Sequence, residues 1–242
     1  MITCIKQFIF RHPLLERSAR RVLDLRYKLA LRYLRGVGLE AGALDRPLYL
    51  PRAVKAFYLD RLLPADLYAH YPELAHRHFY VSMVGDGETL DCLRDNSLDF
   101  LIANHVIEHC HDPIRALETF VSKLKPGGKI FMAVPDMTKT FDRERDETPL
   151  AHLVEDHARG PETSRSRHYM EWATRVEHLR DSVALGRANE LSAQDYSIHF
   201  HCWTRSGFSE FLKHLAANLP LRVVERKSWR NENIFIIEKM KA

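Results

Sequence analysis

The stretch that decides the fold runs Ser97-Leu-Asp-Phe-Leu-Ile-Ala-Asn-His-Val-Ile-Glu-His109. Residues 98–103 are almost wholly apolar, which is typical of a strand buried on both faces of a parallel sheet. Asp112-Pro113 follows, and an aspartate before a proline suits the N-cap and first position of a helix. Pro126-Gly127-Gly128 ends that helix, and residues 130–134 are the next predicted strand. The stretch therefore predicts a strand–helix–strand unit.

The alternation of strands and helices continues on both sides of this unit. Upstream, short apolar runs predict strands at residues 37–43, 54–59 and 79–84, with a helix over 64–74. Downstream, Thr204 is a predicted N-cap, because an apolar stripe at helical spacing follows it. The last apolar runs, 221–224 with an extension to 229 and then 234–238, predict an antiparallel pair. The pattern as a whole is that of an α/β fold.

The chain of 242 residues is long enough for one domain with an insertion. Residues 1–35 carry nine basic and two acidic side chains, and we interpret them as a basic N-terminal helical arm. The α/β domain is expected over 36–242, with a polar helical insertion at about 136–198. The arm could touch an anionic membrane peripherally or bind a partner. We favour a helix that packs on the domain and exposes its basic face to solvent.

Composition excludes several classes of function. Outside the arm the net charge is negative, so we expect no nucleic-acid binding. No apolar stretch is long enough to span a bilayer, and the N-terminus lacks a signal-peptide cleavage pattern. The four cysteines, Cys4, Cys92, Cys110 and Cys202, are widely scattered. Their spacing indicates reduced thiols, and we predict a cytoplasmic protein.

Glycine and polar side chains follow the predicted strands at the edge where open parallel sheets bind ligands. These residues are Gly42, Asp60, Asp86, Gly87, Asn104 and His105. A glycine lets a ligand approach the backbone closely. An acid after the second strand, here Asp60, commonly accepts hydrogen bonds from both hydroxyls of a ribose. Asp86, after the third strand, could reach an exocyclic amine.

In this order and spacing, the segments from about residue 36 to 136 resemble the class I S-adenosylmethionine-dependent methyltransferases, most closely the type 11 methyltransferase-domain group. The resemblance implies a Rossmann-like, seven-stranded, mostly parallel sheet with helices on both faces. It also implies S-adenosyl-L-methionine as cofactor. The cofactor-binding positions that it implies are Glu40, Gly42, Asp60, Asp86, Gly87, Asn104 and His105. Among these, Gly42 corresponds to the methionine end, Asp60 to the ribose and Asp86 to the adenine.

The glycine-rich loop departs from the family. The usual E-x-G-x-G-x-G is here Glu40-Ala-Gly42-Ala-Leu44-Asp-Arg46, so only the first glycine is present. Leu44 would crowd a tightly bound loop. Two interpretations stay open. The loop is reshaped, as in some relatives associated with glycosyltransferases and cell-surface sugars, or cofactor binding is weakened and the protein is a degenerate, non-catalytic binding protein.

Histidines supply the candidates for acceptor chemistry. An oxygen acceptor needs a base, and we single out His157, His199 and His201. The spacing of His105, His109 and His111 resembles a metal motif, but it falls on a strand–turn–helix junction, so we expect no metal site. The function expected is methyl transfer to a small-molecule or glycan acceptor, at oxygen. A nicotinamide-dependent dehydrogenase is disfavoured because its glycine fingerprint is absent. A membrane-peripheral adaptor working through the basic arm is the remaining alternative.

Overall fold

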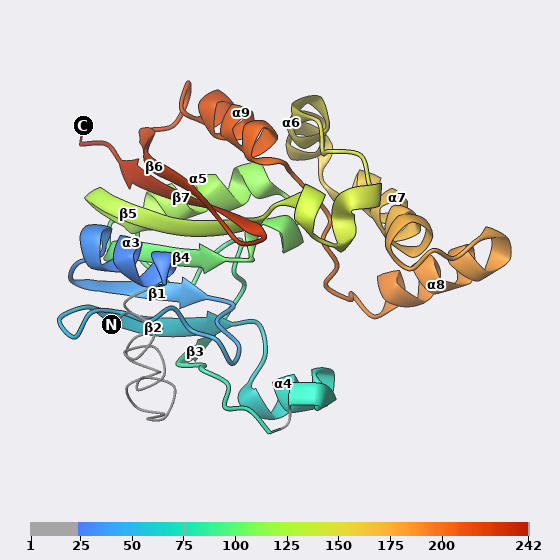
Figure 1. The fold of residues 1–242 in the computed structure, drawn as a ribbon, viewed down its shortest axis with the longest axis horizontal. Helices are drawn as coiled ribbons and strands as arrows, with labels where there is room; N and C mark the ends of the chain where they lie inside the picture. Colours follow the sequence, from blue (N-terminus) through green and yellow to red (C-terminus); the bar gives the residue numbers. More distant parts are fainter. Residues whose placement is uncertain (1–23, 75, 242) are drawn as a thin grey trace, which may run out of the picture.

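The computed structural model describes residues 24–74 and 76–241. It contains one seven-stranded sheet in the order β3-β2-β1-β4-β5-β7-β6 (Figure 1). Its strands are β1 Val37–Ala41, β2 Lys55–Asp60, β3 Met83–Val84, β4 Leu98–Asn104, β5 Leu124–Pro135, β6 Leu221–Trp229 and β7 Glu232–Lys239. Strands β1 to β5 pair in parallel, and β7 is antiparallel to both β5 and β6. The predicted fold class and the antiparallel final pair are confirmed.

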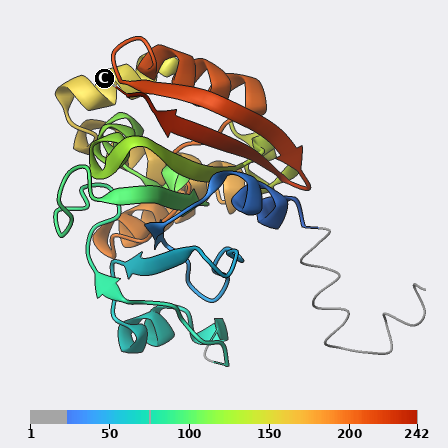
Figure 2. The ribbon, with the colours of Figure 1, turned by 90° about the vertical axis from the view of Figure 1, so that its left-hand side faces the viewer.

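Alternation along the central strands divides the core into two layers. From β4, Leu101 and Ala103 face one layer, whereas Phe100 and Ile102 face the other. Helices α5 (Pro113–Lys123) and α9 (Arg205–Leu215) cover the first layer, and α3 (Leu25–Tyr33) covers the second. Figure 2 shows α3 set apart from α9 by the thickness of the sheet. Burial on both faces explains why β4 is so uniformly apolar.

Two helix starts follow the predicted caps. The side chain of Asp112 accepts a hydrogen bond from the Arg115 backbone N–H at 3.0 Å, with Pro113 in the first turn of α5. Thr204 caps α9 in the same way, through the backbone N–H of Gly207 at 3.2 Å. Each side-chain oxygen satisfies a backbone donor that the helix itself leaves unpaired.

Strand β3 and the helix that follows β2 are shorter than the sequence predicts. Strand β3 pairs with β2 over two residues only, because Phe79 packs on Tyr68 of α4 instead of extending the strand. The predicted helix over 64–74 divides into α4 (Pro64–His70) and the 3-10 turn η1 (Pro72–Leu74). Tyr71 precedes a proline and therefore avoids the helical region. Between β1 and β2 the chain forms no helix.

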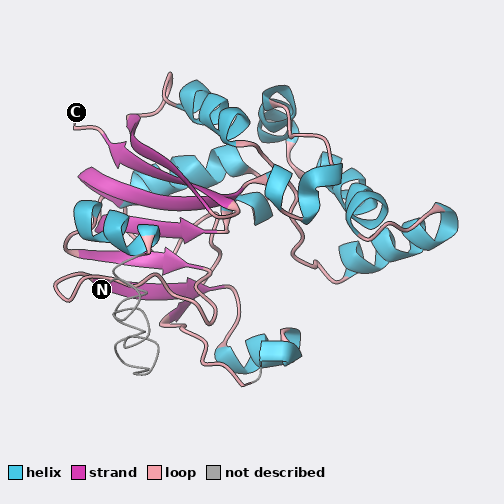
Figure 3. Cartoon of the chain, viewed as in Figure 1, coloured by secondary structure: helices cyan, strands magenta, loops and turns pink. Residues whose placement is uncertain are grey.

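The insertion lies beyond the carboxyl ends of the parallel strands, at the right of Figures 1 and 3. Its elements are η3 Met137–Lys139, η4 Phe141–Glu144, α6 Leu150–Arg159, α7 Glu162–Glu171, the π-turn η5 Trp172–Val176 and α8 Asp181–Ala193. Tyr169, Ala184, Leu191 and Phe200 belong to a hydrophobic cluster separate from both sheet layers. Helices α7 and α8 therefore share a small core of their own, whereas Leu153 of α6 packs into the core of the sheet.

Helix α3 is the described part of the N-terminal arm. Leu29 and Ala30 are buried against the sheet, and Arg26 forms an ion pair with Glu232 of β7. Most of the arm, residues 1–23, lies outside the described residues, so the predicted membrane or partner contact is untested there. Among the described helices, none is both long and apolar enough to cross a membrane.

Candidate active site

A pocket of about 500 Å³ opens at the carboxyl ends of the parallel strands. It is lined from five parts of the chain: Ala41, Gly42 and Leu44 after β1; Leu59, Asp60, Arg61, Leu67 and Tyr71 around the end of β2 and α4; Gly85 to Glu88 after β3; His105, Val106, His109, Cys110 and His111 after β4; Asp195, Ser197 and Phe200 from the end of the insertion. This is the size and position of a ligand site in an open α/β sheet.

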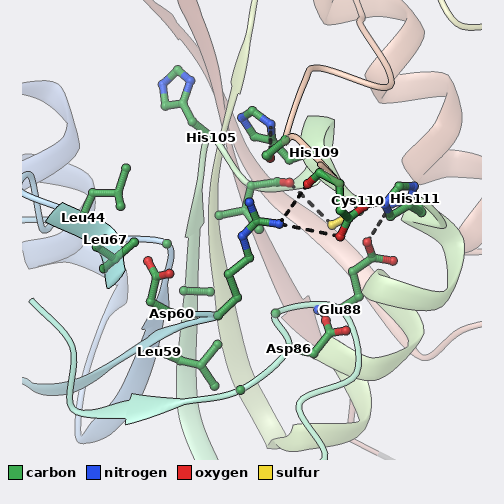
Figure 4. A pocket seen from close by; sticks show the side chains of 18 of the residues that line it. Leu44, Leu59, Asp60, Leu67, Asp86, Glu88, His105, His109, Cys110 and His111 are labelled. Atoms are coloured by element: carbon green, nitrogen blue, oxygen red, sulfur yellow. Dashed lines mark hydrogen bonds and ion pairs between the residues drawn. The ribbon is translucent and has the colours of Figure 1, made fainter. Parts of the chain in front are cut away.

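The loop after β1 approaches the pocket with strained backbone. Gly42 has φ +62°, and a Cβ there would lie 3.3 Å from Cγ2 of Val106. Leu44 also has a left-handed φ of 47°, which is unfavourable for a leucine. Its side chain lines the pocket, as Figure 4 shows. The loop therefore keeps the backbone path of a glycine-rich turn while carrying a bulky side chain.

Three carboxylates from the ends of β2 and β3 stand on one side of the pocket (Figure 4, lower half). Asp60 is buried and accepts a hydrogen bond from the Leu62 backbone N–H at 3.3 Å. Asp86 accepts the Glu88 backbone N–H at 2.6 Å. Beside Gly87 a Cβ would meet nothing within 4 Å, so the pocket has open space at this point. These two acids and this glycine line the pocket, and their contacts with a cofactor stay a prediction.

Glu88 ties the third strand end to the fourth. Its carboxylate accepts the backbone N–H groups of His111 at 2.7 Å and Asp112 at 3.2 Å. Burial raises the pKa of Glu88, and these two hydrogen bonds oppose the rise. The contact joins residues 23 and 24 positions apart, so no local pattern in the sequence could have shown it.

His105 lies opposite the acids, in the centre of an ion chain that reaches the N-terminal helix. Its Nε2 lies 2.9 Å from Glu232, which also pairs with Arg26, and its Nδ1 lies 3.4 Å from Glu108. Burial lowers the pKa of His105, but the two glutamates outweigh burial and raise it to about 9. The same contacts lower the pKa of Glu232 to about 2, against the effect of burial. His105 is therefore a cation at neutral pH, held with a left-handed φ of 55°.

Two of the seven predicted cofactor residues stand beside the pocket without lining it. The Glu40 carboxylate accepts the Leu48 backbone N–H at 2.9 and 3.0 Å and so holds the loop after β1. Burial raises the pKa of Glu40 to about 7. The amide of Asn104 is buried and has no hydrogen-bond partner among the described residues. The other five residues, Gly42, Asp60, Asp86, Gly87 and His105, all line the pocket.

The three candidate bases come close to the pocket but do not line it. His157 of α6 contacts Asp112 at 2.9 Å and keeps 30% of its side chain exposed. His199 contacts Asp142 at 2.7 Å. His201 is fully buried, and burial lowers its pKa well below the usual value. The segment around His199 and His201 is not a strand, and the two rings have different partners.

The sequence predicts no role for Arg61, and it singles out His109 for its metal-like spacing. Arg61 follows Asp60 directly, and its guanidinium lies 4.0 Å from Asp195 at the end of the insertion. His109 lines the pocket and donates from Nδ1 to the Ile198 carbonyl oxygen at 2.9 Å. Burial lowers the pKa of His109 to about 4, so its ring is neutral. Only tertiary structure brings the insertion to the strand ends, although the position of Arg61 beside Asp60 was a usable signal.

Part of the chain matches a known protein family, and several solved structures are similar to it. Residues 52–132 match the family described as "Methyltransferase domain". Similar solved structures include an S-adenosylmethionine-dependent methyltransferase from Aquifex aeolicus (13% identity, 98% of this chain and 96% of that chain, TM-score 0.48). A second comes from Thermotoga maritima (16% identity, 90% and 89%, TM-score 0.48). A third is a complex between the Trm112 methyltransferase activator of Haloferax volcanii and a methyltransferase (17% identity, 89% and 89%, TM-score 0.49).

The search of curated proteins found no match. At these identities, the solved structures transfer neither a substrate nor a partner to this chain. The assignment therefore rests on the matched family and on the chain's own strand order, with its antiparallel β7. The resemblance seen in the sequence is confirmed: residues 52–132 match the methyltransferase-domain family, and the sheet has the strand order of a class I Rossmann-like methyltransferase fold.

Proposed function

We propose that the protein transfers a methyl group from S-adenosylmethionine to an oxygen of a small or sugar-like acceptor. The observation that carries the proposal is the pocket itself: donor-side acids from β2 and β3 share it with residues from the insertion. A family member needs a cavity for the donor and a separate wall for the acceptor. The insertion, through Asp195, Ser197 and Phe200, supplies that second wall.

The donor side fits the cosubstrate of this family. Asp60 is the candidate partner for the ribose hydroxyls, and Asp86 is the candidate partner for the adenine amine. The space beside Gly87 admits a flat ring system, since a Cβ there would touch nothing. The cationic His105 and the unpaired amide of Asn104 lie after β4, where an amino-acid carboxylate would be held.

Bound S-adenosylmethionine supplies a methyl group activated by a sulfonium, so this chain's residues chiefly position the acceptor and exclude water. Transfer to a hydroxyl also requires a group that takes its proton. His157 is the most suitable of the three candidates, because Asp112 orients the ring and part of it reaches solvent. His201 is too deeply buried to exchange a proton readily.

The preference for a sugar-like acceptor rests on the altered glycine loop, which resembles that of relatives associated with cell-surface sugars. Polar side chains at the rim, including Arg61, Asp195 and Ser197, match a hydroxylated ligand. The arm's peripheral membrane contact and a cytoplasmic location remain predictions alongside this one.

One observation favours a second function. Leu44 projects into the pocket from a strained backbone position, where the family usually has glycine. A protein that has lost methyl transfer and kept its fold for binding would tolerate such a residue. The two functions differ in whether the pocket still binds the donor.

Calorimetry with S-adenosylmethionine and S-adenosylhomocysteine separates these functions. We expect micromolar binding by the wild type and a loss of at least ~10-fold in Asp60→Ala, since a good pair of hydrogen bonds to a charged group contributes more than 1.4 kcal/mol. Asp91→Ala is a matched control, because Asp91 is exposed and does not line the pocket. A well-folded wild type that binds neither compound would reject the methyltransferase function in favour of the binding protein.

A further inference from the structure

Glu108, His109 and His199 bring three metal-ligating side chains together behind the wall of the pocket. One ligand atom from each residue lies within 4.8 Å of the other two. The side chain of Glu108 is 1% exposed, and neither of its carboxylate oxygens accepts a hydrogen bond from a described residue. The His105 ring, 3.4 Å from Oε1 of Glu108, compensates part of this buried charge, and a metal cation would lower the cost of the oxygens that accept no hydrogen bond.

Both imidazoles are already oriented as metal ligands are. Nδ1 of His199 lies 2.7 Å from the carboxylate of Asp142, and Nδ1 of His109 lies 2.9 Å from the carbonyl oxygen of Ile198. Because a carbonyl oxygen and a carboxylate accept, each Nδ1 carries the proton and each Nε2 presents a lone pair. Metal-binding histidines characteristically donate their other ring N–H to a carboxylate or a backbone carbonyl.

Arg145 and two aromatic rings hold His199 and its partner Asp142 in place. Arg145 donates to the Asp142 carboxylate at 2.9 Å and to the carbonyl oxygen of His199 at 2.8 Å. The rings of Phe141 and Trp172 pack on His199 with centroid distances of 4.7 and 6.1 Å.

The charges around the cluster favour a cation. The acidic groups are Glu108, Asp142, Glu171 and Glu232, and the basic groups are His105, Arg145 and Arg26. The acids thus exceed the cations by one. The site has three ligands and opens toward the pocket on the side of His109. This is the two-histidine, one-carboxylate pattern with free positions.

A second histidine cluster, formed by His152, His168 and His201, is a weaker candidate. The Nε2 atoms of His152 and His168 lie 3.1 Å apart, so they satisfy each other. Arg167 lies 3.1 Å from Nδ1 of His152 and donates to it. That hydrogen bond places the proton of neutral His152 on Nε2, the atom that a metal would need. This cluster serves as an internal comparison.

We propose that Glu108, His109 and His199 bind a divalent transition-metal ion such as Zn²⁺, which presents a free coordination position to the acceptor. This departs from the expectation from spacing that the chain has no metal site. Metal–ligand distances of about 2.0–2.2 Å would bring the ligand atoms to about 3.3 Å apart, so the site contracts on binding. The role for the acceptor rests on the proposed function: the ion binds the acceptor oxygen and makes its proton easier to remove.

Metal content tests the site directly. The full chain is stripped with a chelator, reloaded with Zn²⁺ or with Co²⁺ as a visible probe, and the bound metal is measured by mass spectrometry. We expect one ion per chain and at least ~100-fold weaker binding in His199→Asn. Asp142→Asn keeps all three ligands and should weaken binding ~10–100-fold, as loss of an outer partner does. His168→Asn is the matched control, and we expect its metal content to be unchanged.

Circular dichroism of each variant shows whether it has folded. If His199→Asn does not fold, the metal content of Asp142→Asn and Glu108→Gln tests the site instead, and we expect it to fall in both. A folded wild type that retains no stoichiometric ion overturns the proposal, and so does metal loss in His168→Asn with retention in His199→Asn. S-adenosylhomocysteine binding is measured on the metal-free chain in parallel. If the metal-free chain does not bind S-adenosylhomocysteine, the proposed function is rejected. The number of zinc ions bound per chain still tests the metal site in that case.

Discussion

At the scale of single residues, Leu44 is the residue least suited to its position, because a bulky side chain stands on a left-handed backbone at the pocket. Its left-handed backbone costs about 1 kcal/mol relative to glycine, and its side chain occupies space in the pocket. Leu44→Gly should therefore tighten S-adenosylhomocysteine binding ~3–10-fold in calorimetry. Leu44→Ala removes the side chain but keeps the strained conformation, so it should give part of that gain. Weaker binding in both variants would show that Leu44 contacts the ligand favourably.

Glu40 makes stability depend on pH in an unusual direction. Its pKa is raised to about 7 in the folded chain, so between about pH 4.5 and 7 the folded state binds more protons than the unfolded state. Stability therefore falls as pH rises through this window, by about 2–3 kcal/mol. Glu40→Gln should remove most of this pH dependence, because glutamine does not titrate. The fold should tolerate the change, because the amide oxygen can still accept the Leu48 N–H.

Urea unfolding at pH 5 and pH 8 measures the effect. Glu118→Gln, an exposed change on α5, is the control that should follow the wild type. Equal pH dependence in Glu40→Gln and wild type would contradict the assignment of the raised pKa to Glu40.

The donor-side residues could be predicted because each directly follows a strand. Position along the chain fixes Asp60 and Asp86 at the ligand edge, whatever the rest of the fold does. Glu88 could not be predicted as a pocket residue, since the backbone groups that it binds come from a distant segment. The candidate bases were recognised as histidines near the site, but their aspartate partners Asp112 and Asp142 were not.

At the scale of elements, the ion chain through Glu232 joins α3, β7 and the loop after β4. Glu232→Gln keeps the shape and removes the charge, leaving Arg26 and His105 without their shared partner. We expect about 3 kcal/mol of lost stability at pH 7, as for other broken buried pairs. Because the pKa of His105 is raised to about 9, the stability that protonated His105 contributes is fully present below about pH 6.5. This contribution is lost as pH rises through 9.

Two measurements check this prediction. Urea unfolding should show a smaller loss of stability between pH 7 and 9.5 in Glu232→Gln than in wild type, and NMR titration should show the pKa of His105 falling toward 6.5. Glu238→Gln lies on the same strand and has a largely exposed arginine partner, Arg222, so it should cost less than ~1 kcal/mol. A His105 titration unchanged by Glu232→Gln would refute the pairing.

Elements with strong local signals were predictable and the others were not. Helix α5 has a cap, a proline and an apolar stripe, and it begins where those signals place it. Strand β3 was predicted too long because apolarity at Phe79 reports burial, and here the burial is against α4. The helix over 64–74 was predicted as one piece because the restriction that Pro72 imposes on Tyr71 was overlooked.

At the scale of the whole molecule, the insertion has a hydrophobic core of its own. Tyr169, Ala184 and Leu191 pack together apart from the sheet layers. Segments with separate small cores open at lower free energy than the sheet. In hydrogen exchange, the amides of α7 and α8 should therefore exchange before those of β4 and β5. S-adenosylhomocysteine should slow exchange near Asp195 to Phe200, because that segment lines the pocket. Uniform exchange across the insertion and the sheet would contradict this prediction.

The pairing of Arg26 with Glu232 gives the N-terminal helix a consequence for inactivation. Chain cleavage between α3 and β1 would remove no pocket residue from the chain, yet it would free Arg26, the cation that helps hold Glu232, from its covalent link to the sheet. Water would then replace Arg26 beside Glu232, and the ion pair between Glu232 and His105 would weaken. The loop after β4 would be held less firmly. A single proteolytic cut, well separated in sequence from the acids that face the donor, would thereby weaken ligand binding in the pocket.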